Sequence, residues 1–126
     1  METNELLLYV GGGVTAFFAA FHLILPKFLN WKSNLADTTR ETRGAAYALN
    51  MCFALILLGF AVLTFAQTLA MLTTDLGLYL AGVIALFYFL RAGLEPVLFG
   101  LNGARTVGIA GLCTVAGACY LLAPLL

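Results

Sequence analysis

Four long apolar runs, separated by short polar stretches, account for most of the 126-residue chain. They cover approximately residues 6–25, 44–72, 76–94 and 104–122. Each run is long enough to cross a bilayer as a helix, which takes roughly 20 apolar residues. The pattern therefore predicts an all-α integral membrane protein with one four-span transmembrane domain, folded as an antiparallel four-helix transmembrane bundle.

Composition supports the same class of protein. The chain is 63% hydrophobic and only 10% charged, whereas soluble domains carry about 25% charged residues. Glu2 and Glu5 precede the first run in place of the basic residues that begin a signal peptide, so we expect that run to remain as a span. The formal net charge is zero, which gives no indication of a nucleic-acid partner.

The distribution of basic residues predicts the orientation. All six Lys and Arg residues fall in residues 27–43 or at the two ends of the connection between Arg91 and Arg105. Short loops rich in Lys and Arg stay in the cytoplasm. We therefore predict that residues 27–43 form a cytoplasmic surface segment and that both termini lie outside. The expected location is the cytoplasmic (inner) membrane of a bacterium.

Aromatic residues near the ends of the runs are expected to anchor the helices at the membrane interfaces, where amphipathic rings are favoured. The candidates at the outer interface are Tyr9, Tyr79 and Tyr120. The candidates at the inner interface are Trp31 and Tyr47.

Prolines and capping residues predict where the helices begin and end. Pro26 has no N–H, so the carbonyl of His22 loses its helical partner and the first helix should kink or end there. The second helix is expected to begin near Thr39 and to run to Leu72, a length that requires it to tilt, bend or protrude, with Gly59 as a candidate bend. Pro96 should end the third helix at the preceding residue, and Thr74 can cap the start of that helix.

Four polar residues lie near the inner ends of the predicted spans: His22, Asn50, Arg91 and Glu95. Ionisable groups within a span often mark a functional site, so these residues form a candidate ligand site. Such a site could hold an anionic headgroup, a quinone carbonyl or a partner subunit. Each residue also has a structural interpretation: Arg91 can extend to the interface and pair with Glu95, and His22 and Asn50 can form hydrogen bonds between helices.

Several chemistries are disfavoured by the sequence. The single histidine cannot provide a bis-histidine haem site, and no clustered ligands indicate a metal centre. Neither a phosphate-binding P-loop nor a nucleophile elbow is present. We therefore expect no metal and no catalytic residues, and the sequence does not favour an enzyme. A quinone or a lipid remains a possible ligand.

Small residues in the fourth run, including Gly108 and Gly111, would allow close helix packing in lipid. We expect this face to pack mostly within the chain. The alternative is that it joins a second copy or another membrane protein.

The sequence predicts a small polytopic membrane protein that is either an accessory subunit of a complex or a binder of a lipid-like ligand at the cytoplasmic interface. One alternative is an oligomeric small transporter or channel. A second alternative is a quinone-linked or redox-linked membrane component that uses His22.

Overall fold

The computed structural model describes all 126 residues, and every regular element in it is helical. The elements are α1 (Thr3–Phe28), α2 (Trp31–Asn34), α3 (Arg40–Ala66), α4 (Thr68–Thr73), α5 (Asp75–Leu98), α6 (Ala104–Leu122) and the short 3-10 helix η1 (Ala123–Leu125). Four helices are long and apolar enough to cross a membrane: α1, α3, α5 and α6, the last together with η1. The prediction of an all-α chain with four candidate membrane spans is confirmed.

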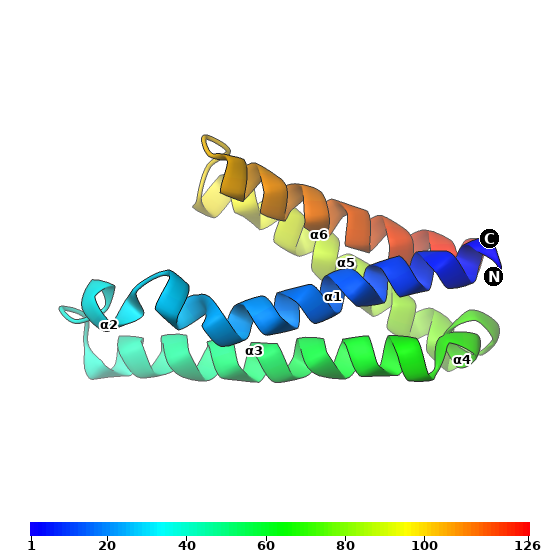
Figure 1. Cartoon of the computed structure of the whole chain (residues 1–126), viewed down its shortest axis with the longest axis horizontal. Coiled ribbons are helices and arrows are strands. Elements are labelled where there is room, and N and C mark those ends of the chain that lie inside the picture. The colour runs from blue at the N-terminus through cyan, green and yellow to red at the C-terminus, as the bar shows by residue number, and fades with distance from the viewer.

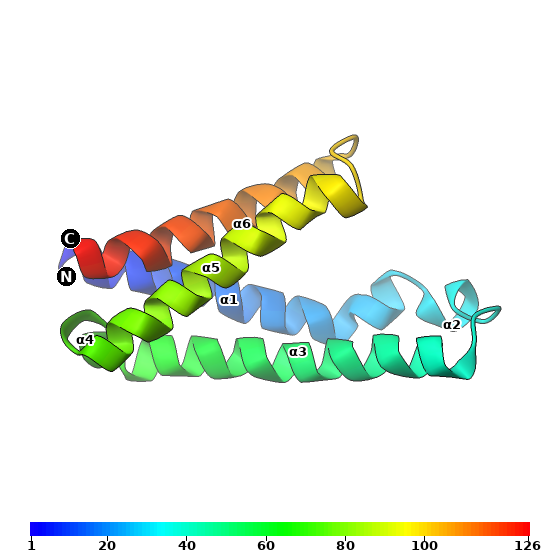
Figure 2. The ribbon, with the colours of Figure 1, turned by 180° about the vertical axis from the view of Figure 1, so that it is seen from behind.

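The long helices form two hairpins that diverge from one end. The first hairpin pairs α1 with α3, and the second pairs α5 with α6 (Figure 1). The hairpins contact each other chiefly through α1 and α6. They meet at the end that carries both termini and separate toward the end that carries α2 and the α5–α6 connection, as the view from behind also shows (Figure 2). We call the latter the open end.

The inward faces of the helices follow helical spacing. In α3 the buried residues are Asn50, Ala54, Leu57, Ala61 and Thr64, at steps of four and three. Large apolar side chains on the other faces, such as Leu55 and Leu86, are 69% exposed. In a bilayer these outward side chains face lipid rather than water.

The second predicted span is two helices rather than one. α3 ends at Ala66, and Gln67 leaves the helical conformation with φ −122° and ψ 33° before α4 begins. The break therefore lies at Gln67 and not at Gly59, the candidate bend that the sequence suggested. The predicted start is confirmed, because the Thr39 hydroxyl accepts a hydrogen bond from the Thr42 N–H at 3.2 Å. Thr74 caps α5 in the same way through the Gly77 N–H at 3.0 Å.

Pro26 and Pro96 both lie inside helices. Pro26 lies two residues before the end of α1, and α5 continues past Pro96 to Leu98, so the expected end before Pro96 was wrong. Each helix instead ends two residues before one with left-handed backbone, Asn30 with φ 53° and Gly100 with φ 73°. A left-handed residue after the last turn is a common helix stop. Each of these residues follows its proline by four positions, so the two hairpins turn at the open end in similar ways.

One predicted interface anchor lies inside the protein. The ring of Tyr120 is fully buried and its hydroxyl bonds to other helices, so this side chain faces the protein interior. The sequence placed it near a helix end but could not show which face it occupies. Tyr79 is 72% exposed, Tyr9 stacks on another helix, and Trp31 packs edge-on against Tyr47 with ring centroids 5.3 Å apart. These four residues remain candidate anchors.

The small-residue face of α6 does not pack within the chain, contrary to our expectation. Open space surrounds Gly108 and Gly111, with no atom within 4 Å of a Cβ placed on either residue. The opposite face of α6, which includes Cys113, Ala116 and Tyr120, packs inward instead. The exposed face therefore stays available to lipid or to another chain.

Candidate functional site

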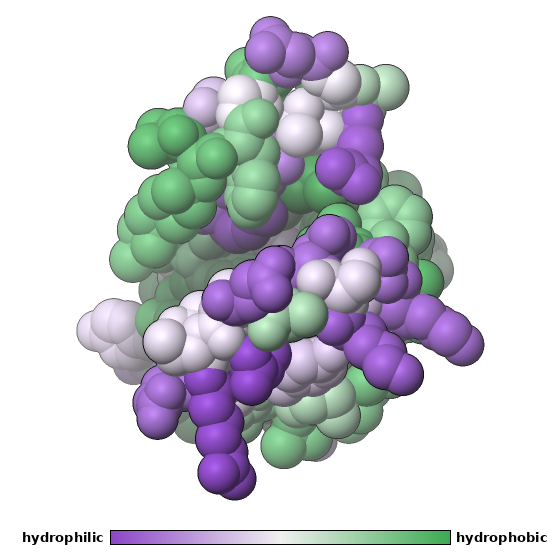
Figure 3. All heavy atoms as spheres, turned by 90° about the vertical axis from the view of Figure 1, so that its left-hand side faces the viewer, coloured by the Kyte–Doolittle hydropathy of each residue, from purple (hydrophilic) through white to green (hydrophobic).

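A cavity of about 300 Å³ lies between the two hairpins toward the open end. Figure 3 looks onto this end, where hydrophilic side chains gather around a hollow between the two parts of the molecule. The volume is at the lower end of the range for ligand pockets, roughly 300–1,000 Å³. Most of the lining residues are hydrophobic, and seven of the 17 are aromatic: Phe18, Phe21, Phe28, Phe53, Phe87, Phe99 and Tyr88.

His22 lines one wall, on α1, and is held from α3 by Asn50. The Asn50 amide nitrogen donates to the His22 backbone carbonyl at 2.7 Å, and the Asn50 Oδ1 lies 2.8 Å from the His22 Nδ1. A carbonyl can only accept, so the first bond fixes the amide orientation and leaves Oδ1 facing the ring. Nδ1 must then carry the ring proton. In the neutral ring, Nε2 is left as a hydrogen-bond acceptor.

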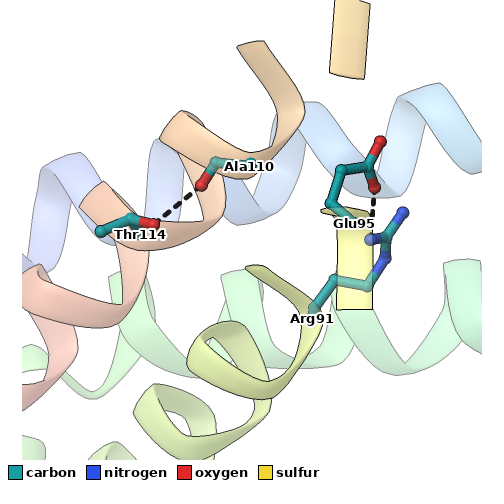
Figure 4. A network of polar contacts seen from close by, with 4 residues as sticks. All are labelled: Arg91, Glu95, Ala110 and Thr114. Carbon is teal, nitrogen blue, oxygen red and sulfur yellow. Dashed lines mark hydrogen bonds and ion pairs between the residues drawn. The ribbon is translucent and has the colours of Figure 1, made fainter. Parts of the chain in front are cut away.

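Arg91 and Glu95 line the opposite wall, one turn apart on α5. Their side chains form an ion pair of 2.6 Å through Arg91 Nη1 and Glu95 Oε2. Figure 4 shows the guanidinium group turned toward the carboxylate. Glu95 is only 2% exposed, whereas one third of the Arg91 side chain is exposed. The Arg91 guanidinium also lies 5.7 Å from the centre of the Phe99 ring.

Arg105 contributes a second positive charge, from the first turn of α6. Its guanidinium lies 5.6 Å from the ring centre of Phe28 on α1, so this contact joins the two hairpins at the cavity. Arg105 forms no ion pair, because the Arg91–Glu95 pair is the one salt bridge in the protein. The cavity thus carries two guanidinium groups and one carboxylate.

Tyr88 lies at the end of the cavity that is farther from the open end of the molecule, and it is the first of a buried set of hydroxyl contacts. Its hydroxyl lies 2.6 Å from the Thr15 hydroxyl, which donates its own proton to the Gly11 carbonyl at 2.8 Å. Because the Thr15 proton is used, Tyr88 must donate to Thr15. This bond ties α5 to α1.

Tyr120 makes the equivalent contact between α6 and α3. Its hydroxyl lies 2.8 Å from the hydroxyl of Thr64, which donates to the carbonyl of Phe60 at 2.7 Å, and 3.3 Å from that of Thr15. The four hydroxyl side chains Thr15, Thr64, Tyr88 and Tyr120 are fully or almost fully buried, and we call them the hydroxyl clasp. The clasp connects all four long helices beyond the cavity floor.

The structure gathers the four predicted site residues at the open end. His22, Arg91 and Glu95 line the cavity, and Asn50 lies behind His22 and supports it. The sequence analysis missed Arg105 as a site residue, as well as the aromatic walls and the hydroxyl clasp. Helical spacing contained part of this information: Phe18 lies one turn before His22 on α1, and Tyr88 lies seven residues before Glu95 on α5.

The arrangement suits an elongated molecule with an apolar part and a charged or polar part. Aromatic walls bury apolar surface, and guanidinium groups bind phosphate or carboxylate oxygens with paired N–H donors. Comparison of the chain with protein-family models, with curated proteins and with solved structures gives no match. A functional conclusion must therefore come from the geometry of the cavity.

Proposed function

We propose that the protein binds one amphipathic, lipid-like molecule in the cavity, at the cytoplasmic interface of the membrane. The observation that carries the proposal is a cavity with aromatic walls whose few charged groups are Arg91, Glu95 and Arg105. Aromatic rings alone would suit any apolar molecule. The charged groups add a requirement for a polar head.

We further propose that the four long helices cross the membrane as an antiparallel bundle, with both termini outside and the open end in the cytoplasm. The open end carries all six basic residues and three acidic ones, whereas Glu2, Glu5 and Asp75 are the acidic residues of the other end. This imbalance favours the open end as the cytoplasmic side. The headgroup of a bound lipid would then lie at the level of the inner leaflet.

The cavity volume limits how much of the ligand is enclosed. About 300 Å³ accommodates a small headgroup and the beginning of one chain, not a whole phospholipid. The rest of the molecule would extend beyond the cavity into the bilayer. A lipid held in this way keeps most of its tails in the hydrocarbon of the bilayer. Only its headgroup exchanges contacts with water for contacts with the protein.

Native mass spectrometry of the protein in mild detergent tests this proposal. We expect one lipid-sized molecule to copurify with the wild-type chain. Ile109→Trp fills the cavity from α6, so the amount of lipid bound to this variant should be at least tenfold lower than for the wild type. Leu112→Trp, on the exposed side of the same helix, is the matched control and should keep it. A wild-type protein that retains no lipid and takes up none from added lipids would contradict the proposal.

A second candidate function is a small transporter, which one observation favours. The cavity opens at one end of the molecule and the hydroxyl clasp closes the other, as in one state of a carrier with alternating access. One copy has no path through the membrane, so transport would require the chain to rearrange or to associate. The open α6 face at Gly108 and Gly111 is the surface we propose for association. Flux across liposomes, measured for the molecule that copurifies, tests this candidate.

A further inference from the structure

We infer that the bound head carries both a primary ammonium group and a phosphate, so that the ligand is an aminophospholipid of the phosphatidylethanolamine class. This inference rests on the proposed function. It adds the chemical class of the headgroup, which follows from how the polar groups of the cavity divide into acceptors and donors.

The first step concerns Glu95. A carboxylate within a membrane span is costly even when it is paired, and Glu95 is 2% exposed on the cavity wall. An acidic lipid would be bound better without it, because the carboxylate repels the ligand and occupies Arg91. A neutral ligand would need neither group. The presence of Glu95 in the cavity therefore favours a ligand with a positive group as well as a negative one.

The second step divides the remaining polar atoms by their function. Glu95 uses Oε2 for Arg91, and a carboxylate has roughly four acceptor sites in total. The neutral His22 ring adds Nε2 as an acceptor, since its Nδ1–H donates to Asn50 Oδ1. Both groups can accept N–H bonds from an ammonium. Arg91 and Arg105 offer N–H donors, which match the oxygens of a phosphate.

The third step separates a primary ammonium from a quaternary one. A choline group has no N–H and is usually bound by the faces of several aromatic rings. Here the Phe99 and Phe28 rings already lie against the guanidinium groups of Arg91 and Arg105. The other aromatic residues of the walls are open to any cation, but only a cation that carries N–H groups can also use the acceptors of Glu95 and His22. These atoms suit an ammonium that can donate protons.

The same head chemistry occurs in a membrane lipid and in water-soluble glycerophosphoethanolamine. The aromatic walls favour the lipid, because a soluble headgroup would gain nothing from burying these rings. Soluble glycerophosphoethanolamine should therefore fail to displace the lipid at equal concentration.

The test offers delipidated protein an equimolar mixture of phosphatidylethanolamine, phosphatidylglycerol and phosphatidylcholine with the same chains, and counts bound species by native mass spectrometry. We expect phosphatidylethanolamine to be bound roughly tenfold more than either of the others, which corresponds to about 1.4 kcal/mol. Binding should fall as the amine is methylated once, twice and three times, because each methyl removes an N–H donor. This series needs no variant and stays informative if a substitution prevents folding.

Variants assign the preference to residues. Glu95→Gln should lower phosphatidylethanolamine binding to the level of phosphatidylglycerol, whereas Arg105→Gln should weaken binding of all three lipids together. Equal or tighter binding of phosphatidylglycerol by the wild type would overturn the inference while leaving the proposed function intact. Displacement by glycerophosphoethanolamine at equal concentration would overturn the claim that the ligand is a lipid rather than its water-soluble headgroup. Absence of any bound lipid would remove both proposals.

Discussion

The side-chain amide of Asn50 makes two hydrogen bonds to His22, one with its backbone carbonyl and one with its ring. The distances are 2.7 Å from the amide nitrogen to the carbonyl oxygen and 2.8 Å from Oδ1 to Nδ1. The carbonyl is the one that loses its helical partner because Pro26 has no N–H. Asn50 thus supplies the missing donor from a neighbouring helix and also sets the ring tautomer on the cavity wall.

Replacing Asn50 by Ala should lower the free energy of unfolding by about 1–3 kcal/mol, because a partly buried carbonyl and a ring N–H of His22 both lose their partner. Pro26→Ala restores an N–H four residues after His22. In the Pro26→Ala background, the Asn50→Ala substitution should therefore cost about half as much. Unfolding in mixed micelles gives the free energy of unfolding of all four proteins of this double-mutant cycle.

An equal loss in both backgrounds would mean that Asn50 does not compensate for the proline. The tautomer offers an independent control. Nitrogen-15 NMR of the wild type should show the His22 proton on Nδ1, and Asn50→Ala should release this restriction.

The hydroxyl clasp should respond asymmetrically to substitution. Thr15→Val removes the acceptor of the Tyr88 proton and leaves a buried donor unpaired, which costs about 1–3 kcal/mol. Tyr88→Phe removes the donor instead, and Thr15 still bonds to the Gly11 carbonyl, so the cost should be about 1 kcal/mol or less. Thr15→Val should then cost less in the Tyr88→Phe background than alone. The free energy of unfolding measures each value.

Thr114 provides the matched control for the clasp. It is exposed on α6 and donates only to the Ala110 carbonyl of its own helix, at 2.8 Å (Figure 4). Thr114→Val should change stability by about 0.5 kcal/mol or less. If Thr15→Val lowers the free energy of unfolding as little as Thr114→Val does, then the clasp makes no measurable contribution to stability.

Parts of this architecture could be predicted from the sequence because they depend on local spacing. Arg91 and Glu95 are four residues apart, which places them on one face of a helix, and the structure shows them paired. The contact between His22 and Asn50 agrees with their similar depth in the spans. Thr39 and Thr74 act as caps because threonine side chains readily accept backbone N–H bonds.

The separation of the hairpins could not be predicted, because lipid and protein interior are equally apolar. Ile84 is fully buried and Leu86 is 69% exposed, yet both suit a spanning helix and hydropathy does not distinguish them. A polar residue within a span is an uncertain guide as well, because Thr15 faces inward whereas Thr114 is exposed. The burial of Tyr120 depends on contacts with Thr64, 56 positions away in the chain. No local pattern contains that information.

Gly77 should tolerate no side chain. A Cβ at this position would lie too close to the backbone of Ala70 and Met71 in α4. Backbone atoms cannot move aside as a flexible side chain does, so Gly77→Ala should cost about 3 kcal/mol, at the upper end for overpacking. Gly82 on the same helix has no atom within 4 Å of its Cβ position. Gly82→Ala should be neutral or slightly stabilising in the same thermal unfolding assay, since alanine favours helix over glycine. Similar losses for both variants would place the effect outside the α4–α5 contact.

The proposed orientation predicts which connections a membrane-impermeant thiol reagent can reach. Ser33→Cys places a thiol in α2, at the open end, and Thr73→Cys places one on the last residue of α4, at the end with the termini. The native cysteines Cys52, Cys113 and Cys119 lie within long helices, and the wild type controls for their reaction.

On intact cells the maleimide should label Thr73→Cys strongly and Ser33→Cys only at the wild-type background. Ser33→Cys should become reactive once the cells are opened. The physical reason is the positive charge of residues 27–43, which keeps this segment in the cytoplasm. The reverse pattern would place the cavity at the outer leaflet, and the ligand would then have to be an outer-leaflet lipid.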